Sequence, residues 1–276
     1  MSDVPYAIIA GAGRFPFHVA REARRRGVPV IAVGIRGWAD PSLAGHVDAY
    51  DEMGVGELGR LIAYLKQRGV RQAVMAGKVT KEVLVDRTTP FDPEAQRLLA
   101  PLRDRSVPSV LGAIAERLAR DGVVLLDSST FLQANLCPAG VVTTRGPTAE
   151  ESDDIRLGLQ AARALATLDV GQTVAVKRRV VVALEALEGT DATIRRGHAL
   201  AGEGLVVVKA ASPAQDRRFD LPVVGTDTIA TLAEVRASCL AVEAGMTLLL
   251  DRAALIARAD AVHLCLIGVR PNDATA

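Results

Sequence analysis

Short apolar runs alternate with amphipathic stretches through the first half of the chain. The run from Tyr6 to Ala10 is continuously apolar, which is typical of a parallel strand buried on both faces. Between Gly56 and Arg68, leucine and isoleucine recur at helical spacing, which predicts an amphipathic helix. By the same criteria, strands are expected at 6–10, 29–34, 73–76 and 123–126, and helices at 15–26, 56–68 and 108–120. This alternation indicates a parallel, doubly wound α/β sheet.

The second half has a different pattern. Two apolar runs, 173–177 and 180–184, are separated only by Arg178-Arg179, which predicts two strands joined by a tight turn. Further strands are expected at 205–209, 239–243, 247–250 and 263–267, with helices at 192–201, 228–237 and 252–259. We therefore expect a second α/β domain with a mixed sheet.

A stretch rich in glycine and proline, from Cys137 to Pro147, separates the two halves. We expect a parallel, doubly wound domain at 1–137, a linker at 138–147 and a C-terminal α/β domain at 148–276 that carries the catalytic groups. Thr148, followed by Glu151 three residues later, predicts a capping box at the start of a helix that reaches about Leu168.

Charge and composition exclude several classes of protein. The chain has 33 basic and 32 acidic residues, a balance that argues against a nucleic-acid binder. It has neither a secretory signal at its start nor an apolar run near the roughly 20 residues of a membrane span. Three widely spaced cysteines lack metal-type spacing and are expected to be thiols in a reducing cytosol. A soluble, cytoplasmic protein is therefore expected.

Two glycine turns follow predicted strands of the first half. Gly11-Ala12-Gly13-Arg14 resembles the start of a dinucleotide fingerprint, but Pro16 stands where its third small residue belongs. The acid expected after the second strand is also missing. The turn can still present backbone N–H groups to a phosphate or nucleotide, or it is simply a tight βα turn. Gly77-Lys78, after the third strand, is either an anion contact or an ordinary exposed lysine, and both readings stay open.

Acids and cations gather at predicted strand ends and loops of the second half. Mg²⁺ is a hard ion that prefers oxygen ligands, and phosphoryl transfer also needs cations near the phosphate oxygens. The candidate acids are Glu185, Glu188, Asp191, Asp216, Asp220 and Asp227, and the candidate cations are Lys209, Arg217 and Arg218. Asp191 and Asp227 also suit the first turn of a helix, so a structural role stays open for both.

Short segments from nearly the whole chain are similar to one known family. They are Gly11–Pro16, Ala76–Val79, Arg145–Thr148, Asp169–Gln172, Glu185–Asp191, Val208–Lys209, Gln215–Arg217, Asp220–Pro222 and Glu243–Gly245. In these segments the chain resembles the LpxI family, the UDP-2,3-diacylglucosamine pyrophosphatases of lipid A synthesis.

The resemblance implies Mg²⁺-dependent hydrolysis of UDP-2,3-diacylglucosamine to UMP and 2,3-diacylglucosamine 1-phosphate (lipid X), with attack on the sugar-side phosphorus. It implies a Rossmann-like N-terminal domain, a distinct C-terminal domain, and a ligand bound in the cleft between them. The expected partner is a lipid-linked nucleotide sugar, met with at most peripheral contact at the cytosolic face of the inner membrane. A homodimer stays open.

The resemblance also assigns roles to residues. The expected catalytic residues are Asp227, Asp191 and Lys209, and the expected metal ligands are Asp227, Asp191 and Asp216. The expected substrate-binding residues are Gly11, Ala12, Gly13, Arg14, Gly77, Lys78, Glu188, Gly189, Thr190, Gln215, Arg217 and Thr226. Many relatives have Lys-Pro where this chain has Ser212-Pro213. Either Lys209 or Arg217 supplies that positive charge, or a cation at position 212 is not required, and these alternatives stay open.

Two other classes of function are weighed against this one. A nucleotide-sugar oxidoreductase would use the glycine turn for NAD(P), and tight NADH binding would reveal it. A nucleotide- or lipid-sensing protein would use the carboxylates only to cap helices, and it would release no UMP.

Overall fold

The computed structural model describes residues 4–80, 88–104, 106–212, 215–219 and 221–270. Contacts within the chain divide these residues into two compact units. The first unit holds the residues up to Leu132 together with the short segment 216–219, and the second holds the others. Asp220, one of the candidate acids, lies outside the described residues.

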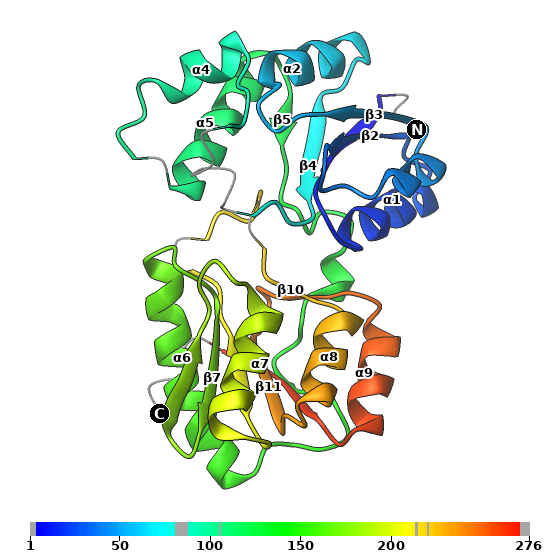
Figure 1. Cartoon of the computed structure of the whole chain (residues 1–276). Helices are drawn as coiled ribbons and strands as arrows, with labels where there is room; N and C mark the ends of the chain where they lie inside the picture. The colour runs from blue at the N-terminus through cyan, green and yellow to red at the C-terminus, as the bar shows by residue number, and fades with distance from the viewer. Residues whose placement is uncertain (1–3, 81–87, 105, 213–214, 220, 271–276) are drawn as a thin grey trace. The chain divides into compact units, whose positions relative to one another are not determined.

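The first unit is built on a parallel sheet of five strands in the order β3-β2-β1-β4-β5, which is the Rossmann strand order (Figure 1). The strands are β1 (Tyr6–Ala10), β2 (Val30–Ile35), β3 (Ala49–Met53), β4 (Gln72–Ala76) and β5 (Val124–Leu125). The helices are α1 (Phe15–Arg25), η1 (Pro41–His46), α2 (Leu58–Gln67), α4 (Pro93–Leu99) and α5 (Val107–Arg120). The predicted parallel, doubly wound sheet is confirmed.

Helices cover both faces of this sheet. Ala7 and Ile9 of β1 share one hydrophobic core with residues of α2, α4 and α5. α1 instead contacts β1, β2 and β4 without joining that core. The alternation of side chains along each strand explains why a buried parallel strand must be apolar on both faces.

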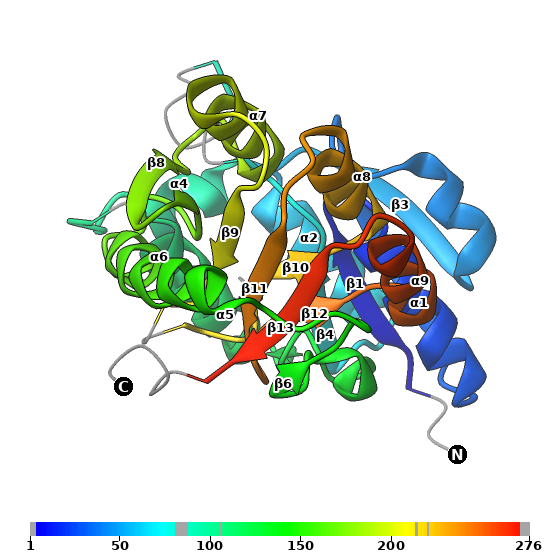
Figure 2. The same cartoon turned by 90° about the horizontal axis from the view of Figure 1, so that it is seen from below.

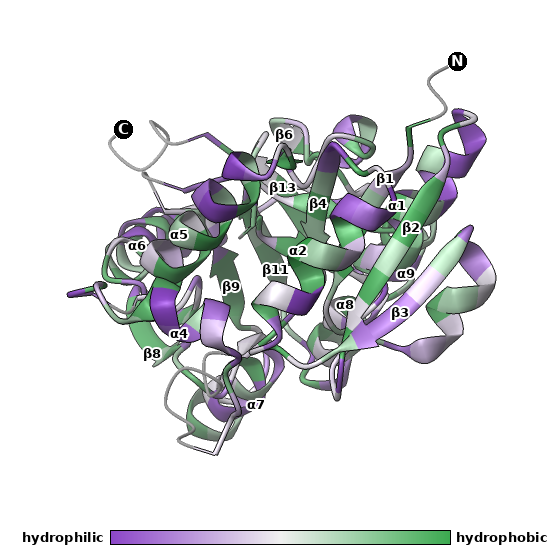
Figure 3. Ribbon diagram, turned by 90° about the horizontal axis from the view of Figure 1, so that it is seen from above, coloured by the Kyte–Doolittle hydropathy of each residue, from purple (hydrophilic) through white to green (hydrophobic). Residues whose placement is uncertain are grey.

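β3 was not predicted, and its position in the sheet explains why. Among the described strands it lies at the edge of the sheet and pairs with β2 alone, and its sequence Ala-Tyr-Asp-Glu-Met mixes polar and apolar residues. Figure 3 shows this contrast, with hydrophobic colour along β2 and hydrophilic patches on β3. One-sided burial leaves no continuous apolar run for the sequence to reveal.

The second unit contains a mixed sheet of six strands in the order β6-β13-β11-β9-β7-β8 (Figure 2). β9, β11 and β13 are parallel, whereas β7, β8 and β6 pair antiparallel to their neighbours. The strands are β6 (Gly140–Val141), β7 (Thr173–Lys177), β8 (Val180–Leu184), β9 (Val206–Lys209), β11 (Cys239–Glu243) and β13 (Cys265–Val269); β10 (Val223–Val224) and β12 (Leu248–Leu249) form a separate pair. The predicted mixed sheet is confirmed.

Helices again cover both faces. They are η2 (Gln133–Asn135), α6 (Ala149–Thr167), α7 (Thr190–Ala201), α8 (Thr226–Glu234) and α9 (Arg252–Ala261). α7, α8 and α9 pack on one face, and α6 packs on the other. The three cysteines are free and buried, as their spacing suggested. Among the described residues, no helix combines the length and the apolar character that crossing a bilayer requires.

Two expectations for this unit need correction. The stretch 138–147, expected as a linker, contains β6, which pairs with β13 and so belongs to the sheet. The last strand begins at Cys265, two residues later than expected, because His263 takes a left-handed conformation (φ 53°) in the turn after α9.

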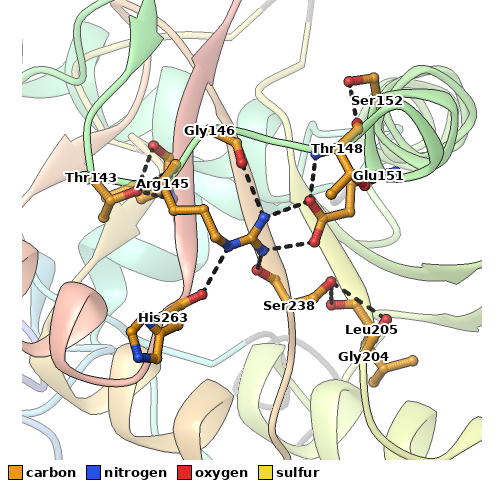
Figure 4. A network of polar contacts seen from close by, with 11 residues as sticks. Thr143, Arg145, Gly146, Thr148, Glu151, Ser152, Gly204, Leu205, Ser238 and His263 are labelled. Atoms are coloured by element: carbon orange, nitrogen blue, oxygen red, sulfur yellow. Dashed lines mark hydrogen bonds and ion pairs between the residues drawn. The ribbon is translucent and has the colours of Figure 1, made fainter.

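An ion pair at the start of α6 anchors that helix (Figure 4). The predicted capping box is present: the Thr148 hydroxyl accepts from the Glu151 N–H, and the Glu151 carboxylate accepts from the Thr148 N–H. The same carboxylate accepts two hydrogen bonds from the Arg145 guanidinium, at 2.7 and 2.8 Å. Arg145 also donates to the carbonyls of Gly146, Ser238 and His263. One arginine therefore ties the helix to the ends of two neighbouring segments.

This network predicts a pH dependence of stability. Burial raises the pKa of Glu151, but the hydrogen bonds from Arg145 and Thr148 outweigh it and lower that pKa from 4.5 to about 2. A carboxyl group with a depressed folded-state pKa stabilises the protein above its unfolded value and loses that contribution as pH falls. The contribution, roughly 3 kcal/mol, should therefore disappear between about pH 4.5 and 2.

Urea unfolding of wild type and Glu151→Gln across this range measures the effect. The difference in unfolding free energy should be largest near neutral pH and shrink toward pH 2. A difference independent of pH would contradict the assignment of the titration to Glu151.

Candidate active site

In the first unit, the loops after β1 and β4 meet backbone to backbone. The Ala12 N–H donates to the Lys78 carbonyl at 2.8 Å, and the Lys78 N–H donates back to the Ala12 carbonyl at 3.0 Å. The glycines permit this approach: a Cβ on Gly11 would lie 2.7 Å from the Lys78 carbonyl oxygen, and Gly77 has φ +97°. The predicted group of Gly11, Ala12, Gly77 and Lys78 is therefore brought together.

The same contacts limit what this turn can offer a phosphate. The N–H groups of Gly11, Ala12 and Lys78 already donate to backbone carbonyls. The charges beside the turn are more accessible. Lys78 and Arg14 are exposed, and Arg14 lies over the ring of Phe17, 5.3 Å from its centroid. The close approach of two loops thus accounts for Gly11 and Gly77, and the side chains of Lys78 and Arg14 are exposed charges accessible to an anion.

The segment 216–219 is held to the first unit by residues that follow β5. Arg217 Nε donates to Asp127 Oδ2 at 2.7 Å, and its guanidinium also donates to Ser129 Oγ at 3.1 Å. Ser128 Oγ donates to the Arg218 carbonyl at 2.7 Å. These contacts give Arg217 a structural role that the sequence did not suggest.

Asp216 is also occupied by a partner. Its carboxylate accepts from the Arg218 guanidinium, at 2.6 Å for the shortest contact, and from the Arg218 N–H at 3.0 Å. These hydrogen bonds lower the pKa of Asp216. Asp216 lies in the first unit, whereas Asp191 and Asp227 lie in the second, so the three expected metal ligands are divided between the units.

In the second unit, a buried polar network lies where β9 ends and β7 begins. Lys209 ends β9 and pairs in register with Thr173, which begins β7. Lys209 Nζ donates to Thr190 Oγ1 at 3.0 Å and to Thr173 Oγ1 at 3.3 Å. Thr190 Oγ1 donates in turn to Glu185 Oε1 at 2.8 Å. Lys209 and Glu185 are only 8% and 9% exposed.

The backbone at Glu185 lies very close to the backbone at Gly171. A Cβ on Gly171 would lie 2.2 Å from the Glu185 carbonyl oxygen, so only glycine fits there. The Gln172 N–H donates to Glu185 Oε2 at 3.1 Å. Burial raises the pKa of Glu185, but nearby Lys209 and the hydrogen bonds from Thr173, Thr190 and Gln172 outweigh it, so the pKa is lowered. Glu185 is therefore an ionised carboxylate at neutral pH.

The start of α7 places the other predicted residues of this loop. Gly189 takes φ +82° and precedes Thr190, the first residue of α7. Glu188 accepts from Arg196 at 2.6 Å and from Thr193 at 3.2 Å, so its charge serves the fold of the loop. Asp191 Oδ1 is buried and accepts no hydrogen bond from any described residue.

Asp227 occupies the same position in α8 that Asp191 occupies in α7, the second helical residue. α7 leads into β9, and α8 leads into β11. Because those strands are parallel, the two helices run in the same direction. Arg195 of α7 donates to Glu234 of α8 at 2.9 Å, so the helices also lie side by side. Asp227 is exposed and makes no polar contact with any part of the described chain.

Three further points complete the site. Gln215 Oε1 accepts from the Ser212 N–H at 2.8 Å, and Thr226 begins α8. The described residues contain no group of three histidine, cysteine, aspartate or glutamate side chains that could hold a metal ion. Thr173 was missed by the sequence analysis, where the one available signal was a threonine at the start of an apolar run. The structure buries it fully, and a buried hydroxyl needs a hydrogen-bond partner.

The first unit is a parallel sheet in Rossmann order, and the second is a mixed sheet with a buried lysine network at the ends of two strands. Together they define a two-domain α/β protein with polar groups at strand ends. A model of the LpxI N-terminal domain matches residues 5–135, and a model of the LpxI C-terminal domain matches residues 138–267. The chain belongs to the LpxI family.

A relative supports this membership along the whole chain. The UDP-2,3-diacylglucosamine pyrophosphatase LpxI of Caulobacter vibrioides is 30% identical over 279 residues, covering 96% of this chain and 98% of the relative.

Solved structures add little. A biotin carboxylase from Campylobacter jejuni in complex with β-γ-ATP is 14% identical with a TM-score of 0.28, covering 72% of this chain and 42% of that one. The biotin carboxylase subunit of pyruvate carboxylase is 14% identical with a TM-score of 0.26, covering 62% and 34%. Similarity at this level does not establish a common fold.

Proposed function

We propose that this chain hydrolyses the pyrophosphate bond of UDP-2,3-diacylglucosamine, releasing UMP and 2,3-diacylglucosamine 1-phosphate in lipid A synthesis. The observation that carries the proposal is the match, over 96% of this chain and 98% of the relative, to a protein named for that activity. In the proposed step, the oxygen of a water molecule bonds to the sugar-side phosphorus. The bond from that phosphorus to the bridging oxygen breaks, UMP leaves with the bridging oxygen, and the proton lost by the attacking water passes to a base or to solvent.

Lys209 is the residue best suited to stabilise charge during this step. A buried ammonium acts on phosphate oxygens in a medium of low dielectric, where its effect is larger than in water. Arg217 is less suited, because its guanidinium already holds Asp127. For Asp227, a role as general base and a role as metal ligand both remain open.

The residues of the second unit fit a divalent cation in part. Asp191 has a buried carboxylate oxygen without a donor, which suits a hard cation. Asp216, which lies in the first unit, would fit only after its carboxylate releases the Arg218 guanidinium. Mg²⁺ is commonly bound by one or two carboxylates together with substrate phosphates, so Asp191 and Asp227 would hold it. When bound, Mg²⁺ would supply positive charge against the pyrophosphate oxygens.

The metal requirement is tested by measuring UMP release from UDP-2,3-diacylglucosamine by the purified protein. With Mg²⁺ present, UMP should form, and EDTA should lower the initial rate at least about 100-fold. Adding Mg²⁺ in excess of EDTA is the control and should restore the rate. Absence of UMP under all conditions would overturn the proposed function, whereas full activity in EDTA would remove only the metal.

The place of the reaction is part of the proposal. We place the activity in the cytoplasm. Because the substrate carries two acyl chains, the protein would meet it at the cytosolic face of the inner membrane. Binding of the ligand between the two domains stays a prediction, as does a homodimer.

A further inference from the structure

Lys209 is a buried ammonium whose hydrogen-bond partners are uncharged. The residue is 8% exposed, and its hydrogen bonds within the described chain go to the hydroxyls of Thr190 and Thr173. An ammonium has three N–H donors, so one donor is left over. A buried charge is costly unless it is paired and hydrogen-bonded. The carboxylate of Glu185 acts on Lys209 only across these hydroxyls, so the remaining donor is available to an anionic ligand.

The two hydroxyls are ordered by Glu185. Thr190 Oγ1 donates its single hydrogen to Glu185 Oε1, so its lone pairs face Lys209. Thr173 Oγ1 also accepts from Lys209, so its hydrogen is directed at Thr190 Oγ1, 3.3 Å away, or at the Glu185 carboxylate. The direction of these bonds is fixed by a carboxylate at one end and an ammonium at the other.

This arrangement differs from an ordinary buried ion pair. A carboxylate in direct contact with Lys209 would neutralise the ammonium and compete with any anionic ligand. With a layer of hydroxyl groups in between, Glu185 can fix the position of the ammonium while leaving much of its charge available. That separation is useful only if another anion approaches Lys209.

We propose that Glu185 is a positioning residue for hydrolysis: through the hydroxyls of Thr190 and Thr173, it holds the Lys209 ammonium so that its remaining N–H contacts a phosphate oxygen of the substrate. This inference rests on the proposed function. It assigns Glu185 no contact with the reacting atoms, and it makes the Thr190 hydroxyl necessary for the rate of the chemical step.

The first test compares Thr190→Ser with Thr190→Val. Serine keeps the hydroxyl and should retain most of kcat, whereas valine keeps the shape and should lower kcat about 10- to 100-fold with a smaller change in KM. Glu185→Gln should resemble Thr190→Val. The matched control is Thr231→Val in α8, which removes another buried threonine hydroxyl and should leave kcat within about 2-fold.

Equal kcat values for Thr190→Ser and Thr190→Val in an active enzyme would overturn the inference and leave the proposed function intact. If wild type releases no UMP, the proposed function fails and the inference fails with it. A loss of kcat in Thr231→Val as large as that in Thr190→Val would also overturn the inference, because the effect would then be general to this fold.

A second test does not depend on turnover. Thermal unfolding is measured for Glu185→Gln, Lys209→Met and the double variant. Removing one charge leaves the other buried without its counter-charge, so each single variant should unfold at a lower temperature. The double variant should unfold no lower than the less stable single variant, because the two changes are coupled. Additive losses would show that Glu185 does not act on Lys209.

Discussion

Asp227→Asn is expected to lose about 10²- to 10⁴-fold in kcat for UMP release, the range that a positioned acid–base group contributes. The substitution keeps the shape of the side chain and removes its charge. Within the described chain the Asp227 carboxylate has no polar partner, so its only structural contribution is to the dipole of α8. The free energy of unfolding should therefore fall by at most about 1 kcal/mol.

Glu150→Gln is the matched control for this prediction. Glu150 also occupies the second helical position, in α6, so the variant removes the same kind of helix-dipole interaction away from the site. Steady-state kinetics and urea unfolding of both variants separate the two effects. Near-normal hydrolysis by Asp227→Asn would remove Asp227 from the mechanism, whatever its effect on stability.

Arg145→Met is expected to cost about 3 kcal/mol of unfolding free energy, the lower end of the range for breaking a buried ion pair, because Glu151 is buried but the Arg145 side chain is 31% exposed. The variant would leave Glu151, which is 8% exposed, without its guanidinium. It would also leave the carbonyls of Ser238 and His263 without this donor. Arg145→Lys should recover only part of the loss, because lysine keeps the charge but cannot donate two parallel hydrogen bonds to a carboxylate.

The control for Arg145 lies in the same part of the fold. Arg156 pairs with Asp153 on the exposed face of α6, where ion pairs contribute little. Arg156→Met should therefore change the unfolding free energy by less than about 1 kcal/mol. A similar loss in both variants would indicate that burial does not set the strength of the Arg145 network.

Local patterns were sufficient for most elements of the fold. The capping box at Thr148 was readable because its two residues lie three positions apart and act on the same helical turn. β1 was readable because burial on both faces leaves a continuous apolar run. β6 was not readable, because its two residues, Gly140 and Val141, become a strand only when β13 pairs with them.

The candidate site was predictable only as a set of residue types. Lys209 and Thr190 could be chosen because polar residues at strand ends and helix starts commonly serve function. Their connection to Thr173 and Glu185 could not be predicted, since it depends on the antiparallel pairing of β7 with β9 and β8. The partner of Arg217 was hidden for the same reason, because Asp127 lies far from Arg217 in the chain. The partner of Asp216 is Arg218, only two residues away, and their contact depends on the local backbone conformation.

The sequence by itself determined the α/β class, the division into two halves and the family, because hydrophobic periodicity and short motifs are local properties of a chain. Only the tertiary structure decided which charges serve the fold and which are left for a ligand. Arg217, Glu188 and Asp216 are occupied by protein partners, whereas Lys209 keeps a donor and Asp191 keeps a buried acceptor. The physical reason is that a hydrogen bond or ion pair requires proximity in space. For Lys209 and Arg217 that proximity comes from the pairing of distant segments, and for Glu188 and Asp216 it comes from the local conformation of the chain.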